Sequence, residues 1–283
     1  MSVWLSGQQQ KPYKGQDFYR MQERYQAAQR VAKAAGKLAL DHLTSMQAGE
    51  LEIEVKGLQD FVTHADRDVE NFIKRELSAL FPGDGYWGEE SERARGKNGL
   101  TWVIDPIDGT ANFIRGIDQW GISIALVSEE RVEIGVIYDP MRDILYHCLH
   151  GQGAVQNGRT MPQLNSGNTR PADTLIILGQ SRRIGFDVYL NTLKYLHEQE
   201  VEHRRFGSAA LGLAQAAEGL VDAYFEADLN PWDCLAGLLL IEECGGVVVS
   251  GQQMLKDLSN YPVAAGKVCL RQELTHLVGL SGR

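Results

Sequence analysis

The sequence lacks the features of secreted and membrane-spanning proteins. It has only four cysteines in 283 residues and no C-x-x-C pair, so we expect reduced cysteines in a cytoplasmic protein and no disulfide framework. Residues 1–20 are polar and lack an apolar signal-peptide core, which predicts a flexible tail. No apolar run approaches the ~20 residues of a membrane span, so we expect a soluble protein without a membrane partner.

Excess positive charge is also missing. The chain has 28 Lys and Arg residues against 37 Asp and Glu residues, for a formal net charge of −9, and no run is rich in Lys and Arg. Nucleic-acid binding needs a basic face, so we expect no nucleic-acid partner. Hydrophobic residues make up 43% of the chain, which is enough to bury a sizeable core.

Periodic patterns predict mixed layers of helices and strands. The polar stretch 165–173 supports a boundary near residues 150–170, and we expect two halves, 21–160 and 161–283. Helical spacing or start and stop residues mark 16–43, 69–80, 186–199, 207–219 and 231–244. Alternating or β-branched runs mark strands at 51–56, 121–127, 132–138, 144–150, 174–178 and 221–226.

The most informative stretch runs from Trp102 to Phe113. An apolar run ends at Asp105, where Pro106 should end the strand, and Asp108 follows one turn later. Gly109 and Thr110 then open a short helix whose free N–H groups face the same space. Two carboxylates this close repel each other unless a cation lies between them, which indicates a divalent metal. The alternative is an ordinary Asp-Gly turn, and these twelve residues leave both interpretations open.

Three other acids have simple local interpretations. Asp66 lies three residues after Thr63, the spacing of a helix capping box. Glu89 belongs to a Gly-Glu-Glu-Ser loop, which is typical of an exposed segment. Asp233 follows Asn230 and Pro231 in the first turn of an apolar helix, where the helix dipole favours a negative charge.

Taken together, three motifs resemble the inositol monophosphatase family. They are residues 88–91, residues 102–113 and residues 231–233, in that order and at matching separations. The resemblance covers most of the chain. It implies alternating αβαβα layers of helices and sheets, and a Mg²⁺-dependent, lithium-sensitive phosphomonoesterase that forms a homodimer and acts on a small phosphate monoester.

The resemblance also implies a set of metal ligands. Glu89, Asp105 and the backbone carbonyl of Ile107 would hold a first Mg²⁺, and Asp105, Asp108 and Asp233 a second. A third, weaker ion would contact Glu89. Oxygen ligands of this kind suit a hard cation.

The remaining site residues follow from the same resemblance. Asp66 and Thr110 would orient and deprotonate the attacking water, while the N–H groups of Gly109 and Thr110 hold the phosphate. The substrate alcohol would contact Asp108, Ala209 and Glu226, and Lys56 and Asp60 would support the metal ligands. The sequence departs from the family at Ala111, where Thr is frequent, and in the spacing from Lys56 to Asp60, which is one residue short of some members.

The expected reaction is hydrolysis of myo-inositol monophosphate to the alcohol and inorganic phosphate. Histidinol phosphate, fructose bisphosphate and a nucleotide 3′-phosphate are alternatives, because substrate choice depends on a few pocket contacts. A mainly regulatory, protein-binding role is the alternative from another class, as some bacterial members of the family are thought to act in transcription complexes. The complete carboxylate set favours the enzyme.

Overall fold

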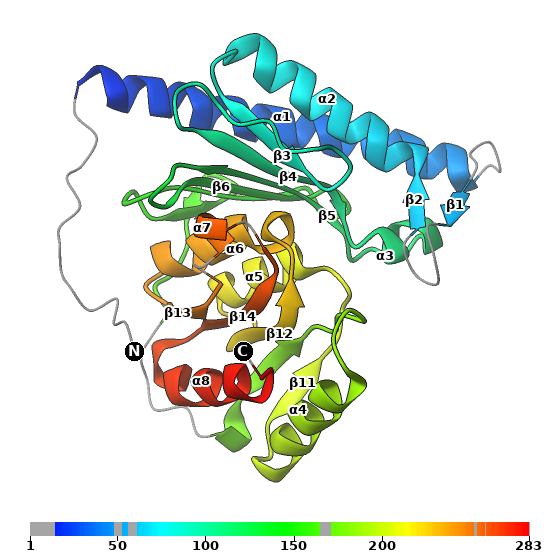
Figure 1. Ribbon diagram of the computed structural model, residues 1–283, viewed down its shortest axis with the longest axis vertical. Helices are drawn as coiled ribbons and strands as arrows, with labels where there is room; N and C mark the ends of the chain where they lie inside the picture. Colours follow the sequence, from blue (N-terminus) through cyan, green and yellow to red (C-terminus); the bar gives the residue numbers. More distant parts are fainter. Residues whose placement is uncertain are drawn as a thin grey trace.

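Five alternating layers of helices and sheets form the protein in the computed structural model, which describes residues 15–47, 53–55, 61–164, 171–251, 254–257 and 259–282 (Figure 1). The helical layers are, from top to bottom of the figure, α1 (Gln16–Gln47) with α2 (His64–Leu80), α5 (Ala209–Glu218) with α6 (Pro231–Glu243), and α4 (Phe186–Glu198) with α8 (Arg271–Leu280). One sheet lies in each gap between these layers. The predicted αβαβα arrangement is confirmed.

The upper sheet has seven strands in the order in which they follow one another along the chain. They are β3 (Gly85–Gly88), β4 (Thr101–Asp108), β5 (Gly121–Val127), β6 (Val132–Asp139), β7 (Ile144–Leu149), β8 (Ala154–Gln156) and β9 (Arg159–Thr160). Only β3 and β4 are parallel. The predicted hairpin of β5 and β6 and the strand after it are confirmed.

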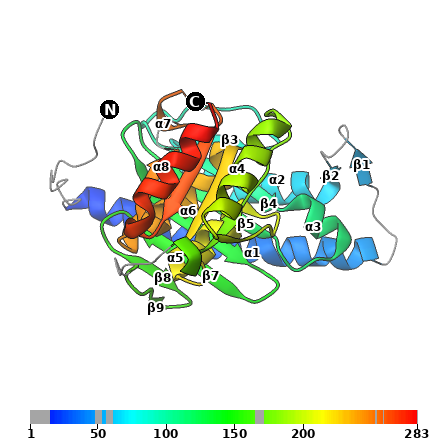
Figure 2. The same cartoon turned by 90° about the horizontal axis from the view of Figure 1, so that it is seen from below.

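The lower sheet has five strands in a mixed arrangement. Their spatial order is β11 (Glu202–Arg204), β10 (Leu175–Leu178), β12 (Ala223–Leu229), β14 (Tyr261–Gly266) and β13 (Val247–Ser250). Figure 2 shows α4 and α8 next to each other on the outer face of this sheet. The smaller elements are β1 (Ile53–Val55), β2 (Phe61–Thr63), α3 (Thr110–Arg115), α7 (Met254–Asp257) and the 3₁₀ turns Pro171–Asp173 and Val268–Leu270.

Helix α6 explains how the two sheets are held together. Its apolar sequence leaves no polar face, and residues 234–241 are buried between β strands of both sheets. The helix backbone passes so close to β6 that a Cβ at Gly135 would lie 2.7 Å from the Ala236 carbonyl oxygen. The start of α6, which carries Asp233, is therefore set against the upper sheet by close packing.

Strand β4 differs from the prediction, because it continues through Pro106 to Asp108. Its pairing with β5 shifts register between Asp105 and Asp108, and its pairing with β3 ends at Ile104. Pro106 therefore lies at a bulge, where a missing N–H costs no regular ladder bond. The prediction that the strand ends at Asp105 was wrong.

Several expectations remain outside these observations. Lys56 and Asp60 lie outside the described residues, and so does most of the predicted tail. The division into halves at about residue 160 stays a prediction. Within the described residues, no helix combines the length and apolar character required to cross a membrane. The four cysteines are free, and three of them are buried.

Candidate active site

A cavity of about 530 Å³ opens at the carboxyl end of β4. Most of the residues that the sequence singled out line it, although they come from five different elements and the loops next to them. They are Glu89, Asp105, Ile107, Asp108, Gly109, Thr110, Ala209, Glu226 and Asp233. The fold therefore brings the three sequence motifs to one place.

Three carboxylates form the centre of this cavity. Asp105, Asp108 and Asp233 offer oxygen atoms that all lie within 4.8 Å of one another. Asp105 and Asp108 are buried, with 2% and 6% of their surfaces exposed, and Asp233 is half-buried. Such a group of oxygen donors suits a hard divalent cation.

A hydroxyl group on β5 sets the two carboxylate-bearing elements against each other. Ser123 is the register partner of Asp105, and its Oγ donates a hydrogen bond to the backbone carbonyl of Trp232 at 3.0 Å. The Trp232 ring also meets the edge of Trp87 on β3, with ring centroids 5.4 Å apart. These contacts hold the first turn of α6, and Asp233 with it, beside the end of β4.

Asp233 is further oriented by its own helix start. The Asn230 backbone N–H and the Asn230 side-chain Nδ2 both donate to Asp233 Oδ2, at 3.1 Å and 3.0 Å. The predicted cap at Asn230 and the proline at the first helical position are confirmed.

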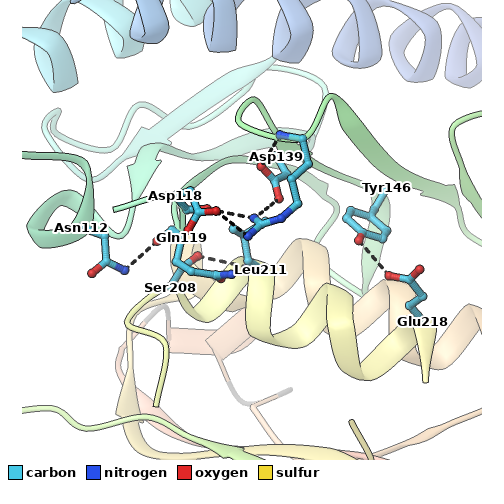
Figure 3. Close-up of polar contacts among 9 residues, drawn as sticks. Asn112, Asp118, Gln119, Asp139, Tyr146, Ser208, Leu211 and Glu218 are labelled. Atoms are coloured by element: carbon cyan, nitrogen blue, oxygen red, sulfur yellow. Dashed lines mark hydrogen bonds and ion pairs between the residues drawn. The ribbon is translucent and has the colours of Figure 1, made fainter. Parts of the chain in front are cut away.

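Asp108 is bound by the start of another helix. The Ser208 hydroxyl and the Ala210 N–H, the latter at 2.8 Å, donate to its Oδ2, and the Ala209 N–H donates to its Oδ1 at 3.3 Å. Ser208 is also the N-cap of α5, since its Oγ accepts a hydrogen bond from the Leu211 N–H (Figure 3). A single carboxylate thus connects the end of β4 to α5.

The pKa values of the clustered acids are raised. Burial and then the charge of Asp233 raise the pKa of Asp108 to about 7, and burial raises that of Asp233 to about 6. Burial followed by the charge of Glu89 holds the pKa of Asp105 well above its usual range. Desolvation by the surrounding protein atoms and then the charge of Asp233 also raise the pKa of Glu89 well above its usual range, although Glu89 is exposed at its surface. A bound cation would therefore favour the ionised form of the whole group.

Next to the carboxylates, a threonine faces a buried acid. Thr110 Oγ1 donates to the Ile107 carbonyl at 3.1 Å and lies 3.5 Å from Oδ1 of Asp66. Asp66 is 2% exposed and lies in the first turn of α2. The sequence predicts a capping box between Asp66 and Thr63. The Thr63 side chain is not among those that the structure describes, so the capping box stays a prediction.

The turn before α3 requires glycine. Gly109 has a φ of 98°, and a Cβ at this position would lie 2.8 Å from the Gln119 carbonyl oxygen. The predicted short helix beginning at Thr110 is confirmed.

Glu226 lies on β12 at the other side of the cavity. The Tyr224 hydroxyl donates to its Oε2 at 2.7 Å, and a Cβ at Gly179 would collide with the same oxygen. Burial is the main cause that raises the pKa of Glu226 to about 8.

Two residues with a supporting position were not found from the sequence. Glu70 is 3% exposed, and its Oε2 accepts the Glu90 N–H at 2.8 Å, which holds the loop that carries Glu89. Asn112 donates through Nδ2 to the carbonyls of Gln119 and Phe206, both at 2.7 Å, and Figure 3 shows the first of these bonds. Asn112 lies within the central motif, but Glu70 has the spacing of an ordinary helix residue and carries no sequence signal.

Comparison with known proteins agrees with this geometry. The model of the inositol monophosphatase family matches residues 20–280. The chain belongs to the inositol monophosphatase family. Inositol-1-monophosphatase of Mesorhizobium japonicum is 39% identical over 235 residues, which is 81% of this chain and 86% of the relative. The Nus factor SuhB of Escherichia coli is 38% identical over 226 residues, or 78% of this chain and 82% of the relative.

A solved structure extends the likeness to the fold. The extragenic suppressor protein suhB from Bartonella henselae superposes with a TM-score of 0.82 at 34% identity, covering 90% of this chain and 98% of that one. Membership of the family supports phosphatase activity. Because the family is metal-dependent, membership also explains why the cavity of this chain holds a cluster of carboxylates.

Proposed function

We propose that this protein hydrolyses a phosphate monoester with Mg²⁺, and that myo-inositol monophosphate is its substrate. The main support is the group of three carboxylates within 4.8 Å of one another, which line a cavity large enough for a small sugar or polyol phosphate. The inositol-1-monophosphatase among the relatives supports the choice of substrate.

The residues present fit a magnesium site. In our proposal Glu89, Asp105 and the Ile107 carbonyl hold one ion, Asp105, Asp108 and Asp233 a second, and Glu89 a weaker third. The carboxyl pKa values of Asp105, Asp108 and Asp233 are raised, and this group of three includes no Lys or Arg. This pattern is expected of carboxylates that bind a metal cation. Bound Mg²⁺ would supply charge stabilisation to the phosphoryl oxygens and would make water more acidic.

The chain's own groups would orient the reactants. The Thr110 hydroxyl, held between the Ile107 carbonyl and Asp66, is placed to accept a proton from the attacking water and to pass its own to Asp66. The N–H groups of Gly109 and Thr110 would bind phosphate oxygens. Asp108, Ala209 and Glu226 would contact the hydroxyls of the alcohol, and Lys56 and Asp60 would support the metal ligands.

Other family properties belong to the same proposal. We infer a homodimer, inhibition by lithium and a cytoplasmic location, with no nucleic-acid or membrane partner. The net charge of −9 supports the absence of a nucleic-acid partner and of a membrane partner, since phosphate-rich surfaces repel an acidic protein.

The proposal is tested by phosphate release from myo-inositol 1-phosphate, with Mg²⁺ and with EDTA. We expect Mg²⁺-dependent turnover that is lost in Asp233→Asn and strongly reduced in Thr110→Val. The matched control is Asp173→Asn, because Asp173 is exposed and does not line the cavity. Activity on other phosphomonoesters alone would overturn the substrate, and failure on all of them would overturn the enzyme.

A regulatory, protein-binding role is the second candidate, because several relatives are named Nus factor SuhB. It predicts that cells in which the Asp233→Asn variant replaces the wild-type protein keep the wild-type phenotype, although the variant has no turnover. Loss of both in parallel would favour the enzyme.

A further inference from the structure

A buried tyrosine accompanies Glu226 on β12. Tyr224 and Glu226 are two residues apart on this strand, so their side chains leave the same face of the sheet, and both line the cavity. Only 2% of the Tyr224 surface and 8% of the Glu226 surface are exposed. The Tyr224 hydroxyl donates to Oε2 of Glu226 at 2.7 Å. The two side chains therefore form a hydrogen-bonded pair within the cavity wall.

Two glycines leave the room that this pair occupies. A Cβ at Gly212 on α5 would lie 2.9 Å from two carbon atoms of the Tyr224 ring. A Cβ at Gly179 would lie 2.7 Å from the Tyr224 hydroxyl and would collide with Oε2 of Glu226. Gly179 is itself held against β12, because its N–H donates to the Phe225 carbonyl at 2.8 Å. The ring and the carboxyl group are thus enclosed from two sides, which restricts their rotation.

The second carboxyl oxygen of Glu226 has no such partner. Within the part of the chain that the structure describes, Tyr224 is the only hydrogen-bond donor to the Glu226 side chain, and Glu226 forms no ion pair there. Oε1 is left for a hydroxyl group in the cavity. This contact can form in either protonation state of Glu226, because a hydroxyl both donates and accepts.

We propose that Tyr224 is a positioning residue for substrate selection, which holds Oε2 of Glu226 and thereby directs Oε1 to a hydroxyl of the alcohol. The cavity then favours phosphate esters that carry this hydroxyl over esters that lack it, because an ester without it leaves a buried oxygen unpaired. This inference rests on the proposed function, in which Glu226 contacts the alcohol. Tyr224 acts through Glu226 and needs no contact of its own with the substrate.

The test compares one ring with and without its hydroxyls. kcat/KM is measured with Mg²⁺ on myo-inositol 1-phosphate and on cyclohexyl phosphate, and the ratio of the two values gives the selectivity. We expect the wild type to prefer the inositol ester at least about tenfold. Tyr224→Phe should lower the ratio about fivefold, as expected for one hydrogen bond, mainly through a higher KM for the inositol ester.

The ratio separates positioning from damage to the fold. Phenylalanine keeps the ring that packs against Gly212, and a ratio does not depend on the amount of folded enzyme. The matched control is Tyr146→Phe, because Tyr146 is also buried and its hydroxyl donates to Oε2 of Glu218 at 2.9 Å, outside the cavity (Figure 3). This control should leave the ratio unchanged. An equal fall in both variants would overturn the inference.

A double variant tests whether Tyr224 acts through Glu226. Glu226→Ala should lower the ratio, and Tyr224→Phe added to it should cause no further fall, since the group that it positions is gone. A full effect of Tyr224→Phe in the Glu226→Ala background would mean that the tyrosine contacts the substrate directly, which would overturn the inference. An unchanged ratio in the single variant, or no preference in the wild type, would also overturn it. In each case Mg²⁺-dependent turnover of the inositol ester leaves the proposed function standing.

A binding measurement decides the inference if neither ester is hydrolysed, a result that would overturn the proposed function. Titration calorimetry with Ca²⁺ in place of Mg²⁺ gives the affinities of the same two esters. We expect the wild type to bind the inositol ester more tightly, and Tyr224→Phe to reduce this difference about fivefold. The same difference in wild type and variant would overturn the inference.

Discussion

The two ends of strand β4 bury carboxylates in opposite ways. Near its start, Asp84 accepts a two-bond contact from the Arg24 guanidinium, at 2.8 Å for each oxygen. Asn98 and the indole N–H of Trp102 donate to the same carboxylate, at 2.6 Å and 3.0 Å. Near the end of β4, Asp105 faces other carboxylates instead.

The difference separates a structural acid from the metal ligands that we propose. The charge of Asp84 is balanced within the protein, so this end of the strand is complete in itself. At the other end, protein N–H and O–H donors orient Asp108 and Asp233, but the cluster of carboxylates still repels itself. Burial of acids whose mutual repulsion is only partly offset by a cation, Arg183, therefore marks the site, rather than burial alone.

The sharpest test exchanges one acid at each end for its amide. Asp105→Asn should reduce Mg²⁺-dependent phosphate release about a thousandfold, because several kcal/mol of charge stabilisation are lost with the ion. Urea unfolding in EDTA should show the variant at least as stable as the wild type, since a repelling charge is removed. Asp84→Asn should instead lower the free energy of unfolding and leave phosphate release per folded molecule unchanged. Equal destabilisation by both changes would refute the comparison.

Removing the cation at the start of β4 should cost stability. Arg24→Met leaves Asp84 buried without a counter-charge, and we expect a loss of about 3 kcal/mol in the free energy of unfolding. Urea titration measures it, and activity per folded molecule should persist. The exposed pair of Arg75 and Glu76 is the control, for which Arg75→Met should change stability by less than about 0.5 kcal/mol. Similar effects of the two changes would contradict the interpretation.

Magnesium should stabilise the protein more as the pH rises. The folded-state pKa values of about 7 for Asp108 and about 6 for Asp233 exceed the unfolded value of roughly 4. Without metal, the stability that these groups contribute is present below about pH 4 and is lost between about pH 4 and 7. Saturating Mg²⁺, which binds the ionised carboxylates, should add about 2–3 kcal/mol at pH 8 and much less at pH 5.

Thermal unfolding with Mg²⁺ and with EDTA across this pH range provides the measurement. The Asp105→Asn variant should show a smaller effect of Mg²⁺ at every pH. A stabilisation that is independent of pH in the wild type would mean that the ion binds elsewhere.

The smallest expected effect concerns the link between Asp108 and α5. Ser208→Ala removes the helix cap and one donor to Asp108, so we expect about 1 kcal/mol less stability and a weaker apparent affinity for Mg²⁺, by a few-fold. Chemical unfolding and Mg²⁺ titration of the activity measure the two effects. Ser208→Thr retains the hydroxyl and should restore both, and failure of this rescue would assign the effect to packing.

Local patterns predicted most elements near the site. The apolar spacing of α1 and α2, the hairpin of β5 and β6, and the cap of α6 all depend on residues close together in the chain. The end of β4 was predicted wrongly, because Pro106 is tolerated only where the partner strand stops and the register shifts. Strands β2, β3, β8, β9, β11, β13 and β14 and helices α7 and α8 were not predicted; most of these strands have only two to four residues, too few for a clear alternating pattern.

The sequence by itself determined the identities of the acids, their motifs and the helix and strand that carry them, because capping, turns and hydrophobic periodicity are local. No local pattern predicted that Asp105, Asp108 and Asp233 share one centre or that Asp66 faces Thr110, which only the family resemblance implied. Only the tertiary structure decided that Asn112 donates to the Phe206 carbonyl and that Glu70 holds the loop that carries Glu89. These arrangements depend on packing α6 between two sheets, and no pattern along the chain records which buried surfaces will meet.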